Sequence, residues 1–115
     1  QRPYPRRYSM SVAMSVNDET TNADGTYLVG RLRCGFLELI ECFGEPLLSQ
    51  DYGKVDFEWV IEFTNGVVLT VYNWKNGPSA GVQGPITQWN IGGRSVNDLS
   101  MLRDVLPESM EVCNA

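Results

Sequence analysis

Two mostly apolar runs on either side of an Asn-Gly pair form the most strongly patterned part of the chain. The runs are VDFEWVIEF (55–63) and VVLTVYNW (67–74), both rich in β-branched and aromatic residues, and the Asn-Gly pair lies at 65–66. Asn-Gly favours the two positive-φ positions of a type I′ turn. The pattern therefore predicts a β-hairpin with a two-residue loop.

A two-residue loop also sets the register of this hairpin. One face of the hairpin would be aromatic and apolar and would pack on the core, while Asp56, Glu58 and Glu62 would lie on the other face. The predicted opposing pairs are Phe63 with Val68, Ile61 with Thr70, Trp59 with Tyr72, and Phe57 with Trp74.

Strict alternation of large apolar residues with serine or alanine over 8–16 predicts a half-buried strand before the hairpin. Polar turn formers over 17–25 predict a loop, after which 26–32 can return as a second strand. We expect these two strands to pair as an N-terminal hairpin.

The apolar period changes to that of a helix over residues 36–43. Phe36, Leu39, Ile40 and Phe43 share one helical face. Gly44 can take a left-handed cap position and Pro46 prevents continuation, so a short helix and then a loop over 47–54 are predicted.

After the hairpin, glycines and prolines over 75–85 predict a long loop, and 86–91 reads as a strand that Gly92-Gly93 breaks. Ser95 can cap a following helix that ends at Pro107, and residues 108–115 read as a tail. The predicted buried stripe of this helix is Val96, Leu99, Leu102 and Leu106.

Together these elements predict an α+β fold, an antiparallel β-sheet built on the central hairpin with two short helices. We expect one domain over 8–107 because 115 residues suffice for a single core. Residues 1–7, with three arginines and two prolines, read as a flexible basic arm.

Charge narrows the classes of partner. Outside the arm the chain holds six basic and 14 acidic residues, so nucleic-acid binding is expected only through the arm. No apolar run reaches the length of a membrane span. We therefore expect no membrane partner.

The chain has no histidine, which removes Ser-His and Cys-His nucleophile pairs and His-ligated zinc. Its three cysteines lack a CxxC spacing, which suits reduced intracellular thiols. Glu58 and Glu62 share a strand face, but without a partner they do not support acid-base catalysis. The sequence predicts no catalytic residue, metal site or cofactor.

The strongest candidate binding site is the predicted strand-to-helix corner at 90–95. Gly92 and Gly93 would leave backbone N–H groups open to a phosphate, with Arg94 and Ser95 beside them. The same glycines also fit a plain tight turn, and the corner lacks a phosphate-loop motif.

Aromatic and polar residues close the two strands next to this corner. Trp74 with Lys75, and Trp89 with Asn90, could stack on a base and bind its edge or its phosphate. Packing in the core is the other interpretation of the two tryptophans.

Several of these segments resemble one family. FGEP (43–46), DFEWVIEF (56–63), the Asn-Gly pair with VVLTVYNWKNG (65–77), and ITQWNIGG (86–93) with a terminal helix are similar to small phage-encoded proteins, among them the anti-Thoeris decoys. Those decoys are oligomers that sequester a cyclic ADP-ribose signal made by host TIR-domain enzymes. Gly35, where a serine-like cap is expected, is a departure, and residues 1–33 do not match.

The resemblance implies a non-catalytic protein in the host cytoplasm that sequesters a small phosphorylated nucleotide to counter host defence. A homo-oligomer is expected, because assembly would bury the acidic, partly apolar outer faces. The alternatives are a viral structural or protein-interaction module without a small-molecule ligand, and an enzyme acting on nucleotides.

Overall fold

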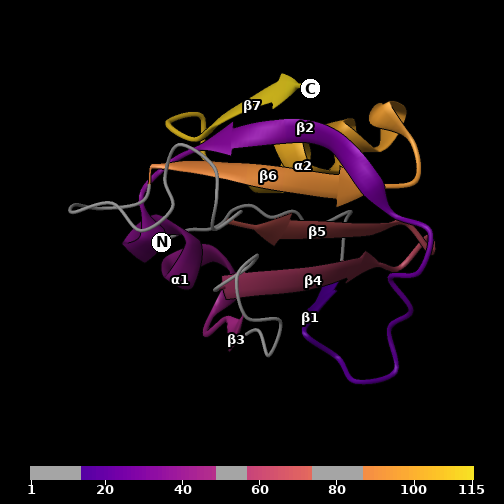
Figure 1. Ribbon diagram of the computed structural model, residues 1–115. Coiled ribbons are helices and arrows are strands. Elements are labelled where there is room, and N and C mark those ends of the chain that lie inside the picture. The colour runs from indigo at the N-terminus through magenta and orange to yellow at the C-terminus, as the bar shows by residue number, and fades with distance from the viewer. Residues whose placement is uncertain (1–13, 49–56, 74–86) are drawn as a thin grey trace.

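The computed structural model describes residues 14–48, 57–73 and 87–115, which form a seven-stranded antiparallel sheet and two α-helices (Figure 1). The strand order is β1-β4-β5-β6-β2-β7, and β3 also pairs with β4. This confirms the predicted α+β fold. The elements are β1 (Met14–Val16), β2 (Tyr27–Arg33), α1 (Phe36–Phe43), β3 (Leu47–Leu48), β4 (Phe57–Phe63), β5 (Val68–Tyr72), β6 (Gln88–Gly93), a 3-10 turn (Val96–Asp98), α2 (Leu99–Val105) and β7 (Glu111–Asn114).

Both helices contribute to the core cluster on one face of the sheet, and in Figure 1 α2 lies behind β6. Alternate strand residues point into this core because side chains alternate across a strand. We call the opposite face, which carries the intervening residues, the helix-free face, since neither helix of the described residues packs on it. Among the described residues, the hydrophobic side chains with no exposed surface are Leu32, Leu39, Trp59, Ile61, Leu69, Val71, Trp89, Ile91, Leu99 and Leu102.

Helix α1 has the predicted bounds, and two buried tryptophans hold its ends. The indole Nε1 of Trp59 donates to the carbonyl oxygen of Gly44 at 2.9 Å, and that of Trp89 donates to the carbonyl oxygen of Cys34 at 3.2 Å. Their rings meet edge to face with centroids 5.5 Å apart. Each tryptophan therefore fills the core and satisfies a backbone group flanking the helix.

The caps of α1 follow from backbone chemistry. Gly35 is the N-cap, and its N–H donates to a carboxylate oxygen of Glu38 at 2.8 Å, so the cap needs no serine hydroxyl. Gly44 adopts a φ of 82°, which confirms the predicted positive-φ end, although its ψ of −158° lies outside the left-handed helical region.

The central hairpin forms, but the predicted two-residue loop is wrong. The N–H of Phe63 donates to the carbonyl oxygen of Val67, so the loop has three residues, and Gly66 alone in it has a positive φ, of 93°. This is the geometry of a turn followed by a glycine bulge.

The extra loop residue shifts the register by one position. Trp59 now lies opposite Val71 and Ile61 opposite Leu69, in place of Tyr72 and Thr70. The observed register buries Leu69 and Val71 completely in the core. It is favoured because the predicted register would have turned a threonine and a tyrosine hydroxyl into apolar surroundings.

We expect Gly66→Val to lower the free energy of unfolding by about 1–3 kcal/mol, because a β-branched residue is strained at positive φ. A Cβ atom added at this position would have no neighbouring atom within 4 Å, so strain and not collision would cause the loss. Urea denaturation measures it, with Gly66→Asn as the matched control that tolerates positive φ. Equal stability of the Val and wild-type proteins would contradict this turn geometry.

The predicted N-terminal hairpin is wrong. β1 pairs with β4 at one edge of the sheet, whereas β2 lies between β6 and β7 towards the other edge. Residues 8–13 of the first predicted strand lie outside the described residues. Alternation in the sequence identifies a strand but not its neighbour, and here both strands find partners later in the chain.

Asn17 explains how two short strands share the edge of β4. Its φ is 57°, its N–H donates to the carbonyl oxygen of Val60 at 2.7 Å, and its Oδ1 accepts from the N–H of Val60 at 2.7 Å. Its Nδ2 donates to the carbonyl oxygen of Glu45 at 3.0 Å. Asn17 therefore continues the ladder of β1 along β4 and ties it to the segment before β3.

Three further predictions are corrected at the ends of elements. Leu47 and Leu48 of the predicted loop form β3, and Glu111–Asn114 of the predicted tail form β7, which pairs with β2. Val96 is 43% exposed and does not belong to the buried stripe, because the first turn after Ser95 is a 3-10 turn that rotates it outward.

The predicted arm at 1–7 and the predicted loop at 75–85 lie outside the described residues. Within the described ranges, no helix has both the length and the apolar character needed to cross a membrane.

Candidate functional site

The predicted phosphate corner does not form, because Gly92 and Gly93 lie inside β6 and do not break it. Gly92 pairs with Leu28 on one side and with Thr70 on the other. A side chain at Gly92 would collide with the hydroxyl of Thr70, and one at Gly93 would lie 2.8 Å from a methyl carbon of Leu69. These glycines allow close packing within the sheet, and their N–H groups do not gather at a helix start.

Arg94 binds backbone carbonyl groups of the loop before β2. Its Nη2 donates to the carbonyl oxygens of Asn22 at 2.7 Å and of Asp24 at 2.9 Å, and its Nε donates to the carbonyl oxygen of Asp24 at 3.1 Å. The side chain of Ser95 accepts from the N–H of Asn97 as the predicted helix cap. The arginine therefore holds a loop by charge-assisted hydrogen bonds.

The structure separates the remaining predicted site residues. Trp89 is fully buried and packs on Phe36 with ring centroids 6.0 Å apart, so it offers no surface for stacking on a base. Asn90 is half-buried on the helix-free face, between Arg31 and Tyr72. Trp74 and Lys75 lie outside the described residues.

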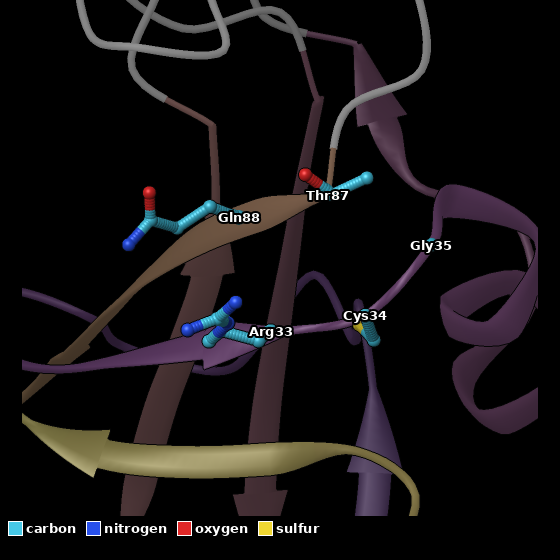
Figure 2. Close-up of a pocket in the computed structure, with 5 residues that line it drawn as sticks. All are labelled: Arg33, Cys34, Gly35, Thr87 and Gln88. Atoms are coloured by element: carbon cyan, nitrogen blue, oxygen red, sulfur yellow. The ribbon is translucent and has the colours of Figure 1, made fainter.

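A pocket of about 430 Å³ lies where β2 ends, α1 begins and β6 starts (Figure 2). Its lining residues are Arg33, Cys34, Gly35, Thr87 and Gln88. The N–H of Cys34 donates to the carbonyl oxygen of Thr87 at 3.1 Å, which joins two of the lining residues. Arg33 and Gln88 are paired across β2 and β6, so their side chains share one face.

The chemistry of this pocket suits binding better than covalent catalysis. Burial, with smaller contributions from Glu38 and Cys42, raises the pKa of the Cys34 thiol to about 12. Burial likewise raises the pKa of Cys42 to about 11. A thiol with such a pKa is protonated at neutral pH and is a poor nucleophile.

Among the four arginines of the described residues, two are engaged with backbone carbonyls. Arg94 binds the loop at 22–24, and Nη2 of Arg103 donates to the carbonyl oxygen of Val112 at 3.3 Å. Arg33 has only a loose ion pair, 3.7 Å from Glu111, and both side chains are well exposed. Such a pair contributes little energy, so the charge of Arg33 stays available to a ligand.

The helix-free face carries the predicted pair Glu58 and Glu62, together with Tyr72 and Arg31. Burial raises the pKa of the half-buried Glu58 carboxyl. Burial also raises the pKa of the Tyr72 phenol, Glu58 raises it further and Arg31 lowers it. Tyr72 is therefore within electrostatic range of both Glu58 and Arg31. The Glu62 carboxylate accepts a hydrogen bond from the hydroxyl of Thr21 at 2.9 Å, so the two glutamates have different partners.

Sequence reasoning missed the pocket. Arg33 directly follows the predicted strand at 26–32, and the alternation over 86–91 puts Gln88 on the correct face of the next strand. What the sequence does not show is that these strands are neighbours, because their pairing joins residues more than 50 positions apart.

Comparison of the chain with protein-family models, curated proteins and solved structures finds no match. In the part of the chain that the structure describes, no group of three or more acidic or cysteine residues is placed to hold a metal ion. The resemblance to the anti-Thoeris decoys stays a prediction.

Proposed function

We propose that this protein is a non-catalytic binding protein that sequesters a small phosphorylated nucleotide in the cytoplasm of a host cell. The observation that carries the proposal is the pocket beside Arg33. It joins a guanidinium with little competing interaction to the hydroxyl of Thr87 and the amide of Gln88. These groups suit the oxygens of a phosphate and the hydroxyls of a ribose.

The size of the pocket and the chemistry of its lining support this proposal. A volume of about 430 Å³ is within the range of small-molecule sites. The absence of histidine from the whole chain and the raised pKa of Cys34 favour binding without turnover. The resemblance supplies the ligand to be tested first, a cyclic ADP-ribose.

Calorimetry with cyclic ADP-ribose isomers tests the proposal, and Arg33→Gln is the informative variant. Loss of one charge-assisted contact should weaken binding about ten- to a hundredfold. Arg103→Gln is the matched control, because it removes the same charge from α2 and should leave the affinity unchanged.

Two results would contradict the proposal. If the wild-type protein binds none of the isomers, the structural or protein-interaction alternative takes precedence. Equal binding by a folded Arg33→Gln protein would remove the pocket from consideration. Recovery of intact ligand after denaturation separates a binder from an enzyme, which would release a converted product.

A further inference from the structure

One row of side chains crosses the helix-free face of the sheet from edge to edge. Each member is paired in register with the next on the neighbouring strand, so all of them point to the same side. In order from β3 to β7 the row is Leu47, Glu58, Tyr72, Asn90, Arg31 and Cys113.

The two charges of this row lack partners among the described residues. No side-chain hydrogen bond or ion pair joins Glu58 or Arg31 to any described residue, although both are half-buried. Three strand spacings, about 14 Å, separate their backbones, and no ion pair joins the two side chains within the described part of one chain. A half-buried charge without a partner has an energetic cost.

The row is self-complementary: a second copy that runs in the opposite order would place each residue over a suitable partner. A two-fold axis parallel to the strands and halfway between β5 and β6 would place Glu58 over the partner's Arg31 and Tyr72 over the partner's Asn90. At the ends, Leu47, which is 44% exposed, would meet the partner's Cys113. A two-fold interface requires this kind of self-complementary surface.

We propose that two copies of this chain pack face to face through the helix-free sheet, with each Glu58 paired to the partner's Arg31. The next row agrees with this arrangement. Val60 would lie over the partner's Leu28, an apolar residue that is 38% exposed in one chain. Between them lie Thr70, which is 3% exposed, and Gly92, so the side chains that make contact in this row are Val60 and Leu28. The proposal does not depend on the nucleotide.

Charge reversal tests the pairing in the full chain. Sedimentation velocity over a concentration series should show a wild-type dimer, and Glu58→Arg or Arg31→Glu alone should raise its dissociation constant at least about tenfold. The double variant restores opposite charges and should return to within about threefold of the wild-type value. Glu41→Arg, an exposed reversal on α1, is the control and should change nothing.

A cysteine variant tests the same geometry without changing charge. Leu47→Cys should form a disulfide with the partner's Cys113 under mild oxidation, visible as a covalent dimer on a non-reducing gel. Leu37→Cys, at a leucine of α1 that is 73% exposed, is the control and should not cross-link in this way. A wild-type monomer at all concentrations, or a folded double charge variant that stays monomeric, would overturn the proposal.

Discussion

Trp89→Ala is expected to lower the free energy of unfolding by about 3–5 kcal/mol, the usual cost of truncating a fully buried large aromatic side chain. The indole has no exposed surface and packs on Phe36 and Trp59. Its loss would open a cavity and leave the carbonyl oxygen of Cys34 without its donor. Urea denaturation followed by circular dichroism measures the change.

Trp89→Phe is the control that separates volume from hydrogen bonding. It keeps a ring in the core but removes the N–H donor, so a smaller loss of about 1–3 kcal/mol is expected. A Trp89→Ala protein with wild-type stability and lost nucleotide binding would contradict the core assignment. That result would return Trp89 to the binding site that the sequence suggested.

Asn17→Ala is expected to lower the free energy of unfolding by about 2–4 kcal/mol, from two lost side-chain hydrogen bonds and a strained positive φ. The lost bonds leave the N–H of Val60 and the carbonyl oxygen of Glu45 without this partner. Thermal or urea denaturation gives the value.

Asn17→Gly divides this effect into its two causes. Glycine adopts a φ of 57° without strain, so the glycine variant should lose only the contribution of the side-chain hydrogen bonds. We expect it to be more stable than the alanine variant and less stable than the wild type. If both variants match the wild type, the side chain of Asn17 does not join β1 and β3 along β4.

Features that depend on residues close together in the chain, such as helix bounds and caps, could be predicted from the sequence. The helix over 36–43 was predicted with the bounds that the structure gives, because its apolar spacing, its terminal glycine and Pro46 agree with one another. The cap at Ser95 was also predicted correctly. Each of these depends on residues close together in the chain.

The pairing of strands that are distant in the chain could not be predicted from the sequence. The register of the central hairpin depended on whether Thr64 joins the loop, a choice decided by what the core accepts on the facing strand. The sequence of β7 predicts only a tail, because four residues carry too little pattern to reveal that they pair with β2.

The candidate site changed for the same reason. The Gly92-Gly93 pair indicates that another group packs closely against the backbone. The sequence alone does not distinguish a bound phosphate from a neighbouring strand. The structure shows that Thr70 and Leu69 make this approach. Arg33 and Gln88 are candidate binding residues only because the structure pairs β2 with β6 and brings the two side chains together.

The strand order also determines when each part of the chain can fold. β2 is completed at Arg33, yet both strands that pair with it come from residues 88–114. During synthesis, both edges of β2 therefore stay unpaired until more than 50 further residues have been made. Such late pairing is characteristic of slow folding and of exposure to aggregation. The polar loop before β2, which Arg94 later fastens, is likewise unsupported until β6 has been made.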